Sequence, residues 1–167
     1  MSCRYCFIAK EGPLRVMSPE TLQDAIAFLE GLTDQPRLHF FGVEPTVNWD
    51  LIVEARRLRP SWPISLTTNG LLLTPERIDW MAENDIKVYV YSIDGGPGHH
   101  IHRRDTRGRE TWDTVAEHLR YLVQSQGDWV TARATWTSDD YDLAGRFRAL
   151  EALGARSIQV VPDIEVG

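Results

Sequence analysis

The fold of this chain is decided by the stretch Ile86-Lys87-Val88-Tyr89-Val90-Tyr91-Ser92-Ile93-Asp94-Gly95. Its valine, isoleucine and tyrosine residues are typical of a β-strand, and the glycine marks the end of that strand. Because side chains alternate between the two faces of a strand, Ser92 and Asp94 share one face. Tyr89 and Tyr91 are then expected on the opposite, core-facing side. The stretch therefore predicts a buried strand that presents polar side chains at its carboxyl end.

Strand-like and helix-like segments alternate on both sides of this stretch. Four other apolar runs are expected to be strands, at residues 38–41, 64–68, 129–137 and 157–161. The segments between them carry apolar residues at helical spacing, with proline at the start of two of the helices. Strands that alternate with helices form a parallel sheet with right-handed crossovers. The sequence therefore predicts an α/β fold, which we expect to be a single domain over residues 1–167.

Composition narrows the range of partners and compartments. The chain has 167 residues, of which 43% are hydrophobic and 25% are charged, as in an ordinary globular domain. Its net charge of −6 argues against nucleic acid as a partner. No apolar run approaches the roughly 20 residues of a membrane span, so we expect no membrane partner. Cys3 and Cys6 are the only cysteines, which indicates a reducing compartment, and we expect the cytoplasm.

Polar residues gather where the predicted strands end, and parallel α/β folds bind their ligands at the carboxyl ends of the strands. These residues are Glu44, Thr67, Asn69, Ser92, Asp94 and Arg133. In the run 129–137, Arg133 belongs to a polar set that alternates with apolar residues. One face of that strand therefore suits helix packing, and the other suits a ligand-lined lumen.

The pair Cys3 and Cys6 can present two thiolates to one metal centre, and it leaves three interpretations open. Cluster ligation is favoured, and a redox dithiol or half of a zinc site are the alternatives. A zinc site could recruit the histidines that follow Asp94. We instead expect those residues to form a solvated loop, comprising His99, His100, His102, Arg103, Arg104, Arg107 and Arg109.

Four motifs in order give the chain a resemblance to a known family. They are Cys3-Arg4-Tyr5-Cys6-Phe7, Gly42-Val43-Glu44-Pro45, Thr67-Thr68-Asn69-Gly70 and Ser92-Ile93-Asp94-Gly95. With them the chain resembles radical S-adenosylmethionine enzymes, in particular the sulfatase-maturase-like group. The resemblance implies a partial (βα)₆ TIM-like barrel whose parallel sheet lacks the first strand. The signature of the family is C-x₃-C-x₂-C, and Cys3 and Cys6 match its last two cysteines. We therefore expect a truncated fragment or a misplaced start.

The resemblance also implies cofactors and the residues that hold them. The cofactors are a [4Fe–4S] cluster, with Cys3 and Cys6 as metal ligands, and S-adenosylmethionine. Cleavage of S-adenosylmethionine to a 5′-deoxyadenosyl radical would remove hydrogen from a peptide or protein substrate, with flavodoxin or ferredoxin as reductant. By resemblance, the residues around S-adenosylmethionine are Tyr5 near the adenine, Gly42 and Glu44 at the amino group, Thr67 and Asn69 at the floor, Ser92 and Asp94 at the ribose or methionine part, and Arg133 at the carboxylate.

Two departures from the family pattern keep a second hypothesis open. Val43 replaces a glycine where backbone approaches ligand, and its side chain is expected to crowd that turn. Two thiolates also do not complete the ligand set that the cluster needs. The alternative to an enzyme core is therefore a non-catalytic remnant, an α/β domain that binds a nucleotide-like ligand or a partner chain.

Overall fold

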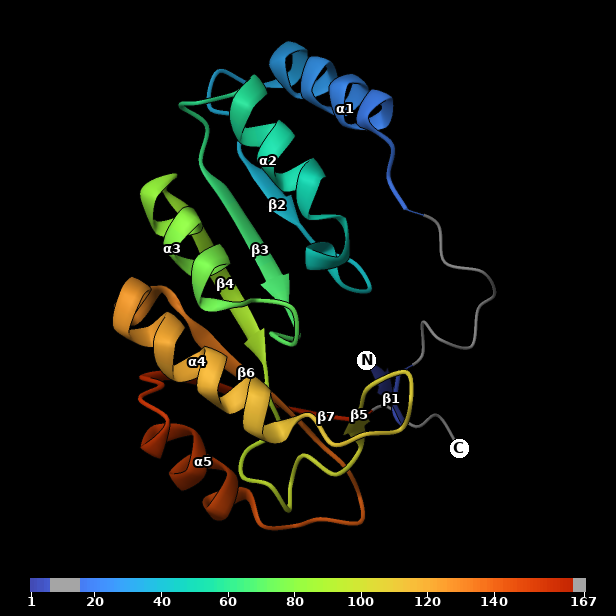
Figure 1. The fold of residues 1–167 in the computed structure, drawn as a ribbon, viewed down its shortest axis with the longest axis vertical. Coiled ribbons are helices and arrows are strands. Elements are labelled where there is room, and N and C mark those ends of the chain that lie inside the picture. Colours follow the sequence, from blue (N-terminus) through green and yellow to red (C-terminus); the bar gives the residue numbers. More distant parts are fainter. Residues whose placement is uncertain (7–15, 164–167) are drawn as a thin grey trace.

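The computed structural model describes residues 1–6 and 16–163, and a five-stranded parallel sheet runs through its centre (Figure 1). The strands follow the order β2-β3-β4-β6-β7, and every neighbouring pair is parallel. Their bounds are β2 (Leu38–Phe40), β3 (Ile64–Thr68), β4 (Ile86–Ser92), β6 (Thr131–Trp136) and β7 (Ser157–Pro162). The prediction of an α/β fold with a parallel sheet is confirmed, and the sheet is part of a (βα) barrel.

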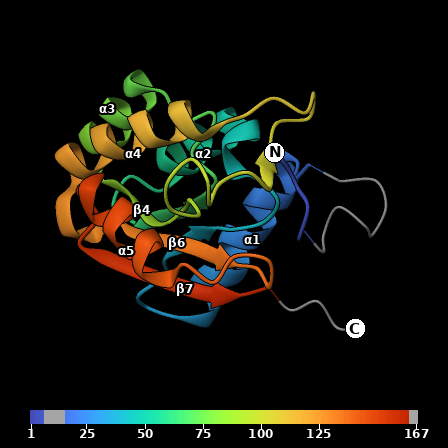
Figure 2. The ribbon, with the colours of Figure 1, turned by 90° about the horizontal axis from the view of Figure 1, so that it is seen from below.

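Helices connect successive strands and pack on the sheet (Figures 1 and 2). They are α1 (Pro19–Leu32), α2 (Trp49–Leu58), α3 (Pro75–Glu83), α4 (Trp112–Gln126) and α5 (Leu143–Ala152), with short 3₁₀ turns η2 (Pro45–Asn48) and η3 (Gly127–Trp129). Helix α1 packs on α2, α3 and α4 lie together against β4, and α5 contacts β6. Among the described residues, no helix is long and apolar enough to span a membrane.

Local sequence explains where these elements begin and which sides they bury. Ser18 caps α1 through a hydrogen bond that the Thr21 amide donates to its hydroxyl, and Pro19 occupies the first turn as predicted. On β6, Ala132 and Ala134 are fully buried under the helices, while Arg133 is only half-buried. The alternation read from the sequence of this strand is therefore confirmed.

The central strand corrects one expectation about the core. Tyr91 is fully buried, but Tyr89 is 59% exposed and lies on the other face, at the edge of the His39 ring. The pairing register of β3 and β4 shifts between Leu66 and Thr67, so β4 carries a bulge and its alternation changes phase there. Tyr89 was therefore wrongly placed in the core, because a bulge breaks the strict period of two.

A second, small sheet lies beside the carboxyl end of the large one. Strand β1 (Ser2–Cys3) pairs antiparallel with β5 (Arg103–Arg104), and the Arg4 amide donates a further hydrogen bond to the carbonyl of His102. In Figure 1 the arrowheads of β3 and β4 point toward this end of the molecule. The sequence did not predict this pairing, since two-residue strands are too short to show a pattern.

Candidate functional site

Glu44 joins the turn after β2 to the end of β3. Its Oε1 accepts hydrogen bonds from the Thr46 amide (3.1 Å), the Thr46 hydroxyl (2.6 Å) and the Thr68 hydroxyl (2.7 Å). Its Oε2 accepts one bond, from the Asn69 amide at 2.7 Å. The carboxylate thus caps η2 and fixes two loops against each other. Because Glu44 is only half-buried, Oε2 keeps accepting capacity for a further donor.

The Thr-Asn-Gly turn after β3 is held rigidly from behind. Gly70 has a φ of +76°, and a Cβ placed on it would lie 2.0 Å from the hydroxyl oxygen of Tyr91. The Gly70 carbonyl accepts a hydrogen bond from Nδ1 of the buried His118 at 2.8 Å. Only glycine fits this close approach in the left-handed region. These contacts fix the backbone of the turn at Gly70, directly after Asn69.

Thr67 lies on the lumen face of β3 beside β2. Its hydroxyl is 3.0 Å from Nε2 of His39, whose Nδ1 is 2.8 Å from the Ser65 hydroxyl. Burial lowers the pKa of His39, so its ring is neutral at neutral pH. The Thr67 hydroxyl therefore contacts His39 on the same face of the sheet. The sequence did not predict this contact.

Ser92, the last residue of β4, lies beside Arg133 in the middle of β6. They are register partners in the parallel pairing, and the Ile93 amide donates to the Arg133 carbonyl at 2.9 Å. Both side chains are half-buried on the face opposite to the helices. Within the described part of the chain, the Arg133 guanidinium makes no hydrogen bond or salt bridge. It is therefore available to an anion at this edge.

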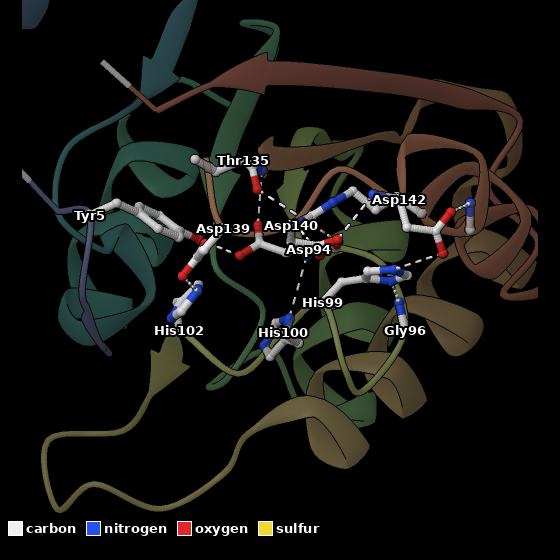
Figure 3. Close-up of polar contacts among 12 residues, drawn as sticks. Tyr5, Asp94, Gly96, His99, His100, His102, Thr135, Asp139, Asp140 and Asp142 are labelled. Carbon is white, nitrogen blue, oxygen red and sulfur yellow. Dashed lines mark hydrogen bonds and ion pairs between the residues drawn. The ribbon is translucent and has the colours of Figure 1, made fainter. Parts of the chain in front are cut away.

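Asp94 is fully buried, and its carboxylate bonds entirely within the protein (Figure 3). Oδ2 accepts from the Tyr5 hydroxyl at 2.5 Å, and Oδ1 accepts from the Thr135 amide at 3.0 Å. The Arg103 guanidinium donates to Oδ1 at 3.4 Å. The resemblance implied that Asp94 faces the cofactor. In the structure its carboxylate anchors the neighbouring segments, with Tyr5 as one of its partners. Contact of either residue with a cofactor stays a prediction.

The segment that follows Asp94 is only in part the solvated loop predicted from its histidines and arginines, since Arg107 and Arg109 are exposed. His100 and Arg103 are 2% and 5% exposed. His100 accepts a hydrogen bond from the Asp94 amide, and its other ring nitrogen lies 3.2 Å from the hydroxyl of Thr111. Burial, aided by the positive charge of Arg103, lowers the pKa of His100 to about 3 and keeps the ring neutral. For His100 and Arg103 the expectation of solvation was wrong, because each group finds a partner inside.

Two half-buried histidines of the segment lie close to aspartates of the β6–α5 connection. The distance from His102 Nε2 to Asp139 Oδ2 is 3.3 Å, and that from His99 Nε2 to Asp142 Oδ2 is 3.6 Å (Figure 3). Arg4 also reaches Asp139, at 2.7 Å. Among the residues that the structure describes, no three histidine, cysteine or acidic side chains are grouped as metal ligands. The contacts of His99 with Asp142 and of His102 with Asp139 connect this segment to the β6–α5 loop.

Cys3 and Cys6 lie on a tight turn, in which the Cys6 amide donates to the Cys3 carbonyl at 3.1 Å. Both thiols are free and partly buried. Burial raises the pKa of Cys3, and the nearby Arg103 acts in the opposite direction. The turn brings two thiols together, but a [4Fe–4S] cluster with one open iron takes three thiolates. The donor set of this sequence therefore does not fit the complete cluster, since Cys3 and Cys6 are its only cysteines.

The predicted site residues thus form three neighbouring groups along one edge of the sheet. Hydrogen bonds connect Glu44 with Asn69, strand pairing connects Ser92 with Arg133, and Tyr5 bonds to Asp94. Among the described residues, no side-chain hydrogen bond or ion pair runs directly from a predicted site residue of one group to a predicted site residue of another. Gly42 lies on the exposed turn before Glu44, and the side chain of Val43 is 49% exposed.

Sequence reasoning did not single out four residues that shape this edge. They are Thr68, Arg103, Thr135 and Arg146. The alternation of β6 placed Thr135 on the same polar face as Arg133, but it gave Thr135 no partner. Nothing local in the sequence indicates that Arg146 is 1% exposed and donates to the Asp94 carbonyl at 2.7 Å.

Comparisons with known proteins agree with this arrangement. A family model described as the radical SAM superfamily matches residues 1–135. No curated protein matches the chain. Native anSMEcpe with bound AdoMet superposes with a TM-score of 0.83 at 20% identity, over 98% of this chain and 48% of that chain. Native anSMEcpe with AdoMet and the Kp18Cys peptide gives a TM-score of 0.87 at 19% identity, again over 98% and 48%. The chain therefore spans about half the length of these structures.

Proposed function

Since the chain belongs to the radical SAM superfamily, we propose that it is the core that binds S-adenosylmethionine at the carboxyl edge of its sheet. The amino-acid end of this molecule carries an ammonium and a carboxylate. Glu44 Oε2 can accept a further hydrogen bond after β2, and Arg133, level with the end of β4, has a guanidinium that no described residue pairs. Charges of both signs on one edge complement such a zwitterion, and this is the observation that carries the proposal.

The other predicted site residues have supporting roles in this proposal. Thr67 and Asn69 form the floor between the two charges, and Ser92 offers a hydroxyl beside Arg133. Gly42 keeps the turn before Glu44 open, because no atom lies within 4 Å of a Cβ placed there. Tyr5 supplies an aromatic ring next to the cysteine turn. Arg133 suits a carboxylate because its planar fork can donate two parallel hydrogen bonds.

We extend the proposal to a peptide or protein substrate. Support comes from the structures of anSMEcpe with AdoMet and the Kp18Cys or Cp18Cys peptide, which share this fold. Hydrogen abstraction from that substrate, with a small redox protein such as flavodoxin or ferredoxin as reductant, requires a protein in which a third thiolate joins Cys3 and Cys6. The residues of this sequence would then hold S-adenosylmethionine and orient it.

Isothermal titration calorimetry tests the assignment of the two charges. The variant Arg133→Met should weaken S-adenosylmethionine binding at least tenfold, as loss of a charge-assisted bond predicts. Arg148→Met, on the exposed part of α5, is the matched control and should leave the affinity unchanged. Decarboxylated S-adenosylmethionine should bind the wild type and Arg133→Met equally. A penalty of the same size with both ligands would contradict the role of Arg133.

The incomplete thiolate set favours a second candidate function, a domain that binds a nucleotide-like ligand without a cluster. Anaerobic reconstitution with iron and sulfide separates the two candidates. About four iron and four sulfide per chain, lost in Cys6→Ala, would favour the enzyme core. S-adenosylmethionine binding without retained iron would favour the domain without a cluster.

A further inference from the structure

We propose that Tyr5, Asp94 and Arg103 form a latch that positions the cysteine-bearing segment against the end of β4. The relevance of the latch to cofactor binding rests on the proposed function, but its contacts do not. Tyr5 lies between the two cysteines, Asp94 follows β4, and Arg103 belongs to β5. Three segments that are distant in the sequence therefore meet in one polar cluster.

Each of the three side chains of the latch contacts the other two. The Tyr5 hydroxyl donates to Asp94 Oδ2 at 2.5 Å and accepts from Arg103 at 2.9 Å. Arg103 also approaches Asp94 Oδ1, at 3.4 Å. The side chains of Arg103 and Asp94 are 6% and 1% exposed. A buried ion pair is stable only when further hydrogen bonds satisfy it, and the phenol of Tyr5 supplies one to each partner.

Backbone contacts carry the effect of the latch to the cysteines. Strand β1 pairs Cys3 with Arg103, so the residue that bonds Tyr5 also faces the first cysteine across the small sheet. The Arg4 amide donates to the His102 carbonyl at 3.1 Å, and the Arg4 guanidinium reaches Asp139. The same carboxylate approaches His102 (Figure 3). Loss of the latch would leave the segment held by one short pairing and exposed contacts, which contribute little.

The other side of the latch is fixed in the sheet framework. The Thr135 amide donates to Asp94 Oδ1, and the buried Arg146 donates to the carbonyls of Asp94 and Thr135. His100 accepts from the Asp94 amide. The anchor point thus belongs to the carboxyl ends of β4 and β6, the two strands that contain Ser92 and Arg133. The latch therefore holds the cysteines in fixed relation to the edge proposed to bind S-adenosylmethionine.

The mildest test removes only the phenol oxygen. In Tyr5→Phe, hydrogen exchange of the Arg4 and Cys6 amides should speed up about 10- to 100-fold, the range expected for losing a hydrogen bond to a charged group. Tyr141→Phe is the matched control, because Tyr141 is 74% exposed, and exchange at Arg4 and Cys6 should match the wild type. Amides of β3 and α4 should remain protected in both variants, which distinguishes local release from global unfolding.

Arg103 provides the second test, with rescue by a conservative change. Arg103→Met should release the segment at least as much as Tyr5→Phe, and Arg103→Lys should recover part of the protection, since an ammonium can still reach the Tyr5 hydroxyl. Unchanged exchange at Arg4 and Cys6 in Tyr5→Phe would overturn the latch. Equal exchange in the methionine and lysine variants would overturn the role of the charge. Hydrogen exchange is measured without S-adenosylmethionine and without a cluster. The latch can therefore be refuted while the proposed function holds, and the proposed function can be refuted while the latch holds.

Discussion

Glu44 is expected to stabilise the free protein as well as to bind a ligand. The stability of Glu44→Gln in the absence of ligand distinguishes this dual role from a role in ligand binding alone. The carboxylate accepts four hydrogen bonds, from Thr46, Thr68 and Asn69. The substitution keeps the shape of the side chain but turns one acceptor into a donor. Placed at the Oε2 position, the new NH₂ group would face the amide of Asn69, and a backbone amide cannot rotate away.

The expected cost follows from these contacts. One hydrogen bond to a charged group is lost, worth about 1.5–3 kcal/mol, and the remaining bonds weaken because they become neutral. Partial exposure of Glu44 reduces the cost, because water can satisfy some of the groups. We therefore expect Glu44→Gln to lower the free energy of unfolding by about 2–3 kcal/mol.

Urea denaturation at neutral pH, without any ligand, measures this cost. Glu110→Gln is the matched control, because its side chain is 81% exposed and lies 3.4 Å from Arg104. The control should change the free energy of unfolding by less than about 0.5 kcal/mol. If Glu44→Gln behaves like the control, the carboxylate does not hold the two loops together.

Two further predictions concern the supports of the site. Gly70→Ala should cost about 2–5 kcal/mol in urea denaturation, since it combines a positive φ with a collision at Tyr91, whereas Gly31→Ala, in open space on α1, should not destabilise the chain. His100 has a pKa of about 3, below its ordinary value of about 6.5, so the unfolded chain takes up a proton that the folded chain refuses as the pH falls through this window. For each unit by which the pH falls between about 6.5 and 3, this group alone should lower the free energy of unfolding by up to about 1.4 kcal/mol. His100→Gln should remove this part of the dependence of the free energy of unfolding on pH. An unchanged dependence would show that His100 does not titrate in this way.

The parallel sheet was predictable because its signals are long and repeated. Five apolar runs, each followed by polar residues, fix the strand order of an α/β fold within few alternatives. The prediction for Tyr89 failed because a single bulge, invisible in composition, shifts the phase of β4.

The roles of individual polar side chains were less predictable than their locations. Sequence indicated that Glu44 and Asp94 follow strands, but it could not show that their oxygens are engaged by Thr68, Asn69, Tyr5 and Thr135. These partners come from other strands, and their approach depends on the register of the whole sheet. For the same reason, His100 and Arg103 look like a solvated run in sequence, although they are buried against Asp94.

S-adenosylmethionine is expected to bind at the carboxyl edge of the sheet, and mapping of amide chemical shifts during a titration locates its binding site. We predict saturable shifts at Gly42, Asn69 and the amides around Ser92 and Arg133, with none at the loop between α2 and β3. Shifts confined to the hollow of about 620 Å³ lined by Phe147 and Ile158 would contradict binding at this edge, as would the absence of any saturable shift.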